Sequence, residues 1–218
     1  MPRHRLPGDG TPGRGKAVRR HNPLNNGLPR RVLHPGEYYC SRGPMVLSTL
    51  LGSCVSVCLY DERAGAMGMN HFLLAERRHD RTPLLSSEAG RYGIHAMELL
   101  VNRLLALGAQ RRSLRAKAFG GANVLGVHAS ATEPAYRIGE VNVGFVREFL
   151  ARDGIPLVAE DLGGSCARQV HFTSPDYAVY LRRIRSQVDQ VAAEEQRYLD
   201  RSLIERDRRG SKAPIDYW

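Results

Sequence analysis

Residues 54–60 read Cys-Val-Ser-Val-Cys-Leu-Tyr, and residues 65–74 read Gly-Ala-Met-Gly-Met-Asn-His-Phe-Leu-Leu. The first stretch is rich in β-branched and aromatic residues and alternates as a strand does. The second begins with a glycine and ends in apolar residues, and the polar residues 61–64 between them are typical of a short loop. The pattern therefore predicts a β-hairpin.

The hairpin brings a cysteine and a histidine together. If residues 61–64 form the loop, each residue pairs with the one that brings the sum of the two residue numbers to 125. Cys54 then faces His71, with Cβ atoms about 5 Å apart. A thiolate is the reactive form of cysteine, and a nearby imidazole favours that form and carries its proton. Cys54 is thus the candidate nucleophile and His71 its proton carrier. A register slip of one residue would place the two side chains on opposite faces.

The 218-residue chain is 42% hydrophobic and 25% charged, which is typical of one domain with a substantial core. Beyond the hairpin, apolar residues recur at helical spacing in longer runs and alternate in shorter ones. We expect helices over residues 94–107 and 139–152, and strands over residues 114–119, 155–160, 168–172 and 178–181. The predicted fold class is α/β: a single domain with a mixed, largely antiparallel sheet flanked by helices.

Both ends of the chain differ in composition from the middle. Residues 1–31 contain eight Lys or Arg, one acid and five prolines, which predicts a disordered basic tail. Residues 182–218 are densely charged and carry apolar residues near helical spacing, which predicts a helical C-terminal extension. The domain is expected over residues 32–181. Most of the net charge of +10 comes from the tail, where no binding motif indicates a specific role with nucleic acid.

Several classes of protein are disfavoured. No apolar run approaches the ~20 residues of a membrane span, and the N-terminal stretch lacks the apolar centre of a secretory signal. We therefore expect a cytoplasmic protein without membrane insertion. None of the four cysteines forms a CxxC pair, so reduced thiols are expected. Cys54, Cys58, His71 and His95 could be considered as zinc ligands. The i,i+4 spacing of the two cysteines in a strand is too long for both thiolates to bind one zinc ion, so no metal is expected.

Several blocks of sequence follow one another in a definite order: Thr49–Asp61, Asn70–Phe72, Arg91–Gly93, Lys117–Ala122, Ile138-Gly139, Asn142 and Ala159–Gly164. Together they resemble the CheD chemoreceptor glutamine deamidases. The resemblance covers about residues 34 to 181, and the succession of blocks is more specific than any single motif. It implies the fold of that family of cysteine deamidases.

The family's catalytic residues carry over onto matching positions. The resemblance implies a cysteine nucleophile at Cys54, a histidine base at His71 and a hydroxyl residue just upstream of the cysteine. Thr49 or Ser48 fits that third position. The sequence leaves the choice open because the alignment across Leu50 and Leu51 can slip by one residue, and two successive residues of a strand point to opposite faces.

Other residues near the predicted site have supporting roles in this interpretation. The backbone N–H groups around Gly52 and Ser53 are expected to hold the oxyanion of an acyl-transfer intermediate. The surface expected to recognise the substrate includes four residues of the neighbouring segments. These are Phe72, Phe119, Gly120 and Gly121.

The function implied by the resemblance is conversion of glutamine side chains of methyl-accepting chemotaxis receptors to glutamate, which contributes to bacterial chemotaxis. The reaction would pass through a thioester on the cysteine, without a cofactor. The receptors are one implied partner, and a CheC-type phosphatase is another. Two alternatives stay open: an adaptor that binds receptor or phosphatase without turnover, and transglutamination, in which an amine replaces water at the thioester.

Overall fold

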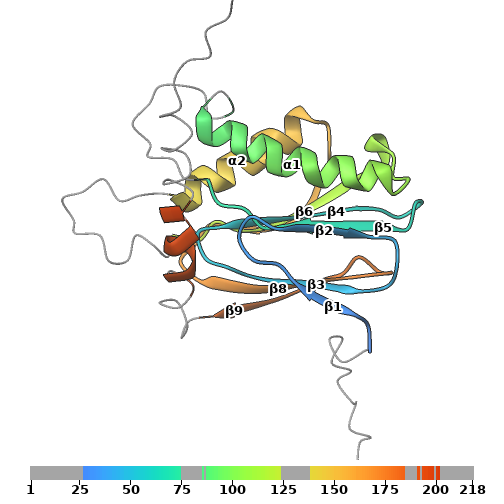
Figure 1. Ribbon diagram of the computed structural model, residues 1–218, viewed down its shortest axis with the longest axis horizontal. Helices are drawn as coiled ribbons and strands as arrows, with labels where there is room; N and C mark the ends of the chain where they lie inside the picture. Colours follow the sequence, from blue (N-terminus) through green and yellow to red (C-terminus); the bar gives the residue numbers. More distant parts are fainter. Residues whose placement is uncertain are drawn as a thin grey trace, which may run out of the picture.

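The computed structural model describes residues 27–74, 85, 87–123, 138–184, 191, 193–198 and 200–201. Figure 1 shows three layers: two helices, a sheet that they cover, and a second sheet beneath it. The α/β fold class predicted from the sequence is confirmed. The strands divide between two sheets rather than joining one, because the central strands are apolar on both faces and each face needs a covering layer.

The helix-covered sheet has five strands in the order β2-β5-β4-β6-β7. All its pairs are antiparallel except β6 with β7, which α2 connects as a crossover. The strands are β2 (Tyr38–Ser41), β4 (Val55–Asp61), β5 (Ala66–Asn70), β6 (Arg115–Gly120) and β7 (Leu157–Leu162).

The second sheet has four strands in the order β1-β3-β8-β9. The β1–β3 pair is parallel and the other two pairs are antiparallel. The strands are β1 (Arg30–Val32), β3 (Val46–Leu51), β8 (Ala167–Thr173) and β9 (Val179–Ile184). Because β3 and β4 follow each other in the chain but belong to different sheets, the segment between them crosses from one sheet to the other.

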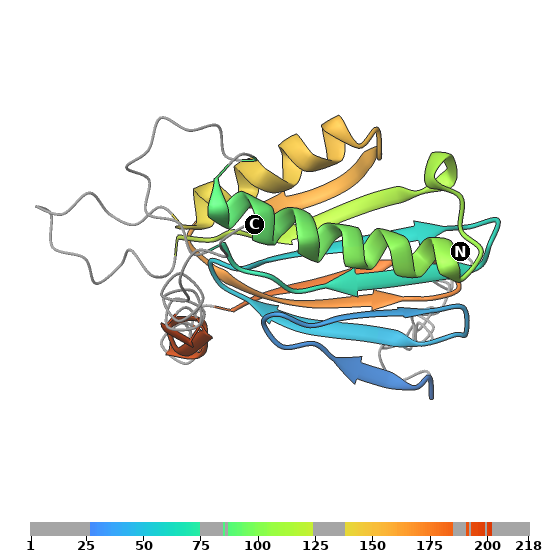
Figure 2. The same ribbon diagram turned by 45° about the horizontal axis from the view of Figure 1, so that its top comes forward.

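The helices are α1 (Glu88–Ala106) and α2 (Ile138–Arg152), and a short 3-10 helix, η2 (Arg111–Ser113), precedes β6. Figure 2 shows both long helices lying across the same face of the sheet. The side chain of Ser87 caps α1 by accepting a hydrogen bond from the Gly90 N–H. A Cβ at Gly93 of α1 would lie only 2.5 Å from the Phe145 ring of α2, so the close approach of the two helices requires glycine there.

Every residue of β4 is buried, and successive residues point in turn to the two faces of the sheet, each of which has its own core. Val55, Val57 and Leu59 lie in the helix-side core, between the helices and the sheet. Cys58, and Cys54 just before the strand, lie in the inter-sheet core between the two sheets. The alternation in the sequence therefore predicts correctly which residues share a face.

The register of the β4–β5 hairpin differs from the predicted one. Asp61 pairs with Ala66 and Cys58 with Met69, so paired numbers sum to 127. The cause is the Asp61 carboxylate, which accepts hydrogen bonds from the Arg63 and Ala64 N–H groups at 2.9 and 3.2 Å. Asp61 therefore ends the strand, and the turn lies one residue later than predicted. A shift of two in register keeps every side chain on its predicted face.

The ordered strands extend beyond the predicted domain limits of 32 and 181. β1 begins at Arg30, inside the predicted tail, and β9 continues to Ile184. A helix is described at residues 191, 193–198 and 200–201, which we call the C-terminal helix. The predicted C-terminal extension is thus strand at its start and helical further on. Residues 1–26 and 202–218 lie outside the described residues, so the disordered tail stays a prediction.

Candidate active site

Residues 52–54, which lie between β3 and β4, form a segment that we call the nucleophile loop. Each of its three carbonyl groups accepts a hydrogen bond from a neighbouring segment. Gly52 O accepts from Ala122 N, and Cys54 O accepts from Gly121 N, both at 2.7 Å. The Ser53 carbonyl accepts from the Asn142 side-chain amide at 2.9 Å. With its carbonyl groups fixed on one side, the loop presents its N–H groups on the other.

These N–H groups converge on a single carboxylate, that of Glu195. Its Oε1 accepts from Gly52 N and Cys54 N, both at 2.9 Å, and its Oε2 accepts from Ser53 N at 2.8 Å. The Ser53 hydroxyl adds a fourth hydrogen bond to Oε2 at 2.5 Å. Successive backbone N–H groups that point to one place form an anion-binding nest. The nucleophile loop is therefore an anion site.

His71 is oriented by Thr49 on the neighbouring sheet. The Thr49 hydroxyl donates its proton to Leu33 O at 2.8 Å, so it accepts the hydrogen bond that joins it to His71 Nδ1 at 2.8 Å. This assigns the proton to Nδ1 and leaves Nε2 with a free lone pair. Nε2 is buried and has no hydrogen-bond partner among the described residues. Burial lowers the pKa of His71 to about 4, so the ring is neutral at pH 7.

The Cys54 and His71 side chains lie on the same face but not directly opposite each other. A bridge joins Val55 to Phe72, which continues the hairpin register. In this register Cys54 and His71 are diagonal neighbours across that bridge, a relation that corresponds to a spacing of roughly 7–8 Å with the Cβ atoms somewhat closer. The prediction that Cys54 pairs directly with His71 is wrong, because Asp61 shifts the register of the hairpin by two. The prediction that both side chains share a face is correct.

The Cys54 thiol is fully buried, and its pKa is raised well above the ordinary value. Burial is the largest cause, followed by the negative charge of Glu195 and its hydrogen bond with the thiol. Glu194 adds a smaller effect in the same direction, while the Cys54 backbone N–H opposes it. In this arrangement the thiol is protonated, because a thiolate would be both desolvated and close to a carboxylate.

The two candidates for the third site residue lie on opposite faces of β3. Thr49 contacts His71, as described above. Ser48 instead bonds to Nδ1 of His171 at 2.7 Å, directly across the β3–β8 pair. The structure therefore brings Thr49, and not Ser48, to the side chains of the candidate site.

The four residues predicted to recognise the substrate are packing residues. Phe72 is completely buried in the helix-side core against Phe145, and Phe119 is 5% exposed in the inter-sheet core. Gly120 has a φ of +105°, and a Cβ there would lie 2.2 Å from Cys54 O. Gly121 has a φ of +67° and donates to the same carbonyl. Gly120 and Gly121 thus pack against the nucleophile loop, and all four residues are buried, so a role for them in recognising the substrate stays a prediction.

Two buried asparagines that carry no role in the sequence interpretation hold the site together. Asn142 of α2 joins the nucleophile loop to the segment after His71, because its Oδ1 accepts from Leu74 N at 2.8 Å. Asn70 accepts from Val57 N at 2.9 Å and so fixes the residue before His71 against β4. The available signal was a polar residue on an otherwise apolar helix face or strand. Glu195 was also missed, and no local pattern indicates its contact.

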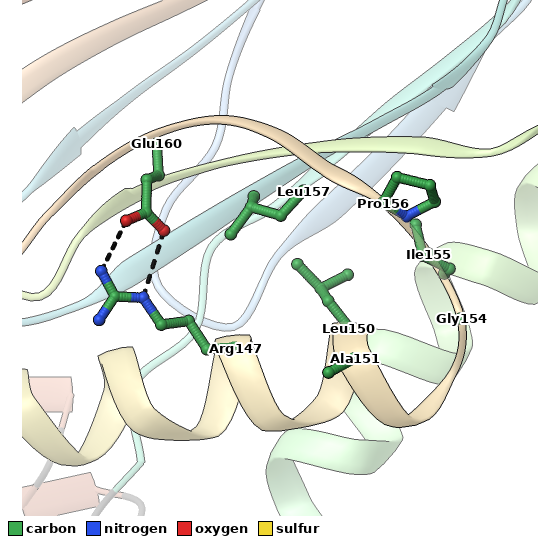
Figure 3. Close-up of a pocket in the computed structure, with 8 residues that line it drawn as sticks. All are labelled: Arg147, Leu150, Ala151, Gly154, Ile155, Pro156, Leu157 and Glu160. Carbon is green, nitrogen blue, oxygen red and sulfur yellow. Dashed lines mark hydrogen bonds and ion pairs between the residues drawn. The ribbon is translucent and has the colours of Figure 1, made fainter.

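A hollow of about 410 Å³ lies elsewhere, between the C-terminal half of α2 and the start of β7 (Figure 3). Its walls are mostly aliphatic, and the Arg147 guanidinium pairs with the Glu160 carboxylate at 2.6 Å at its edge. No cysteine or histidine lines it. Asn142, which contacts the nucleophile loop, lies near the opposite end of α2, so this hollow is separate from the candidate site.

Two other kinds of site were sought in the part of the chain that the structure describes. No group of three or more His, Cys, Asp or Glu side chains there is arranged to hold a metal ion. None of the helices described is both long and apolar enough to span a membrane. All four cysteines are free thiols.

The fold and this arrangement define a class: mixed α/β proteins with a buried cysteine in an anion-binding loop, next to a histidine that a threonine orients. The family model for CheD chemotactic sensory transduction matches residues 73–183. This chain belongs to the CheD family, and the resemblance drawn from its sequence blocks is confirmed.

Three curated relatives are similar over most of their length. A probable chemoreceptor glutamine deamidase CheD 2 of Shewanella oneidensis is 46% identical over 86% of this chain and 93% of the relative. CheD 1 of Geobacter sulfurreducens, with the same description, is 52% identical over 75% and 81%. The CheD of Halorhodospira halophila is 41% identical over 88% and 87%.

Proposed function

We propose that this protein is a protein-glutamine deamidase that converts glutamine side chains of methyl-accepting chemotaxis receptors to glutamate. Cys54 is the nucleophile, His71 the general acid and base, and Thr49 the residue that orients His71. The observation that carries the proposal is the convergence of four hydrogen-bond donors of the nucleophile loop on one point beside the Cys54 thiol. The names of the curated relatives supply the receptor substrate.

The first half of the reaction forms a thioester. His71 Nε2, which carries a free lone pair, takes the proton of the Cys54 thiol, and the thiolate attacks the amide carbon of the glutamine. The negative charge that develops on the amide oxygen is stabilised by the N–H groups of the nucleophile loop. The carbon–nitrogen bond then breaks, and His71 returns the proton to the departing nitrogen, which leaves as ammonia.

The second half releases glutamate. Water enters the position that ammonia has left, His71 removes one of its protons, and the resulting hydroxide attacks the thioester carbon. The carbon–sulfur bond breaks, and Cys54 recovers its proton. Thr49 holds His71 in one tautomer through both steps, because it accepts the Nδ1 proton while its own proton is given to Leu33 O.

The cellular setting follows from the family. A deamidase of receptor cytoplasmic regions would work in the cytoplasm, and a CheC-type phosphatase is the further partner that the resemblance implies. Receptor glutamines lie on the surface of a large assembly, so the site has to accept a side chain presented from outside. Complete burial of Cys54 also suits an adaptor that binds receptor without turnover, and this observation keeps that second function open.

The decisive experiment mixes the full chain with a receptor cytoplasmic fragment and maps Gln-to-Glu conversion by mass spectrometry. We expect Cys54→Ala to lower the rate by at least about 10³-fold, because no other group replaces the nucleophile. Cys58→Ala is a matched control, since Cys58 is equally buried on the same side of the sheet but has no anion site beside it. It should retain most of the activity.

Three other outcomes would contradict the proposal in distinct ways. Conversion that persists in Cys54→Ala would exclude the thioester mechanism. Binding of the fragment by the native chain without any conversion would identify an adaptor. Lysine–glutamine crosslinks in place of new glutamates would identify transglutamination.

A further inference from the structure

The C-terminal helix docks on the candidate site through one face. The residues that contact the rest of the protein are spaced i, i+3, i+4 and i+7, which places them on one side of a helix. They are Val191, Glu194, Glu195 and Tyr198. Gln196 and Arg197, on the other side, are exposed. Figure 1 shows this helix at one end of the two sheets.

Contacts on both sides of Glu195 hold the helix in place. Val191 is 2% exposed and packs in an apolar cluster with Ile184. Glu194 pairs with His34 at 3.2 Å, and the Tyr198 hydroxyl hydrogen-bonds to that of Tyr92. These contacts fix the position of the helix independently of Glu195. The Glu195 side chain, which is 2% exposed, extends from the helix to the nucleophile loop.

The loop binds the side chain of Glu195 as a carboxylate. Each oxygen accepts two hydrogen bonds from the N–H and hydroxyl groups of the loop, so all four of these donors are satisfied. An amide in the same position would set its NH₂ group against the Ser53 N–H, where neither group can accept. The arrangement therefore favours glutamate, which is the product of deamidation. Glutamine, the substrate, can still place its amide oxygen on the Gly52 and Cys54 N–H groups, but it loses the hydrogen bond from the Ser53 N–H.

We propose that the C-terminal helix is an internal ligand of the active site: Glu195 occupies the anion site of the nucleophile loop as the product glutamate does, and it must leave before a receptor glutamine can enter. The inference rests on the proposed deamidase function, to which it adds a means of regulation.

Occupation by Glu195 blocks the reaction in two ways. It fills the N–H groups that have to receive the oxyanion, and its charge adds to the burial that raises the pKa of the Cys54 thiol. Departure of the helix would free the donors and open the thiol to solvent. A receptor helix that presents a glutamine thus competes with the C-terminal helix for the same loop.

The first test measures how fast iodoacetamide alkylates Cys54 in the full chain, by peptide mass spectrometry. We expect Glu195→Ala to raise this rate by at least about tenfold over the native chain, because the thiol gains access and loses a neighbouring charge. Gln196→Ala is the matched control, since it changes the exposed side of the same helix. It should react like the native chain.

Cys58 is an internal standard in the same samples, because it is fully buried between the sheets. Faster alkylation of Cys54 with Cys58 still protected supports the proposal. An alkylation rate in Glu195→Ala equal to that of the native chain overturns it. Reaction at both thiols would report unfolding of the variant, and the second test then decides.

The second test uses Glu195→Gln, which presents an amide to the nucleophile in place of the product carboxylate. If the helix is a product analogue, Cys54 attacks this amide, ammonia leaves, and water releases glutamate at position 195. Peptide mapping should therefore find glutamate there, and should find the amide intact when Cys54→Ala is added.

The receptor assay distinguishes failure of the internal-ligand proposal from failure of the proposed deamidase function. An amide that persists in a Glu195→Gln preparation that deamidates the receptor fragment would overturn the internal-ligand proposal and leave the function standing. Faster alkylation of Cys54 in Glu195→Ala, without deamidation of receptor or of position 195 by any variant, would support occupation of the loop and count against the proposed function.

Discussion

Two histidine–hydroxyl pairs begin on adjacent residues of β3, and only one belongs to the candidate site. Thr49 bonds to His71 at 2.8 Å, and Ser48 bonds to His171 at 2.7 Å. The first pair faces the inter-sheet space near Cys54, and the second lies on the opposite face of the strand. Their nearly equal distances show that a hydroxyl bonded to an imidazole does not define a catalytic site. The thiol and the anion-binding loop lie beside the first pair, and for this reason we propose a catalytic role for that pair alone.

The surroundings of the two rings differ as well. Burial is the largest cause that lowers the pKa of both histidines. His34 lowers the pKa of His71 further, and the positive charges of Arg30 and Arg182 lower that of His171. A neutral ring with a free Nε2 in an apolar space can take a proton from a thiol. The His171 ring lies on the other face of β3, bonded to Ser48 and near the charges of two arginines.

The largest effect that separates the pairs should come from removing each imidazole in turn. We expect His71→Ala to lower the rate of receptor deamidation by about 10³-fold, because proton transfer to and from the thiol, ammonia and water is lost. His171→Ala should change the rate by less than about threefold. The measurement is mass-spectrometric mapping of new glutamates at matched protein concentrations, after circular dichroism has shown both variants to be folded.

The proposal that only His71 takes part in catalysis would be contradicted if His171→Ala lost as much activity as His71→Ala while both variants remained folded. It would also be contradicted if His71→Ala retained the native rate. Either result would move the proton carrier away from the inter-sheet space.

Local patterns in the sequence predict the face of each side chain better than its exact partner. Alternation over residues 54–60 places Cys54 on the inter-sheet side because a strand has a period of two. The register was missed because it depends on the Asp61 side chain, which ends β4 one residue later than the composition suggests. The choice between Thr49 and Ser48 depends on which face of β3 meets the other sheet, and no local pattern decides that.

The Glu195 contact shows the limit of the same approach. The helical spacing of the C-terminal segment indicates a docking face, yet its dense charge is typical of a solvated helix. Glu195 meets Gly52 over a separation of 143 residues, and its partners are backbone N–H groups, which every residue other than proline carries. A contact of this kind is specified only by the assembled fold.

A smaller effect should separate the two hydroxyl groups. Thr49→Val keeps the shape of the side chain but removes the acceptor of the His71 Nδ1 proton, leaving only Leu33 O at 3.4 Å. We expect kcat for deamidation to fall by about 10-fold to 100-fold with little change in KM, because His71 is then held less firmly in the productive tautomer. Ser48→Ala should leave kcat within about twofold.

A structural role alone would not produce that pattern. If Thr49 acted only by packing, Thr49→Ser would be as impaired as Thr49→Val, whereas a positioning role predicts that the retained hydroxyl restores most of kcat. Equal rates for the native chain and Thr49→Val would remove Thr49 from the site.

The smallest effect is a pH dependence of stability. The folded-state pKa of His71 is lowered from 6.5 to about 4, so between these values the unfolded chain binds a proton that the folded chain does not. The contribution of His71 to stability is therefore complete above pH 6.5 and is lost as pH falls towards 4, by at most about 1.4 kcal/mol per pH unit. Denaturant unfolding of the native chain across this range should show the slope, and His71→Gln should reduce it. His171→Gln should keep the part that belongs to His71, and an unchanged slope in His71→Gln would mean that the buried ring is not the neutral group that the Thr49 contact requires.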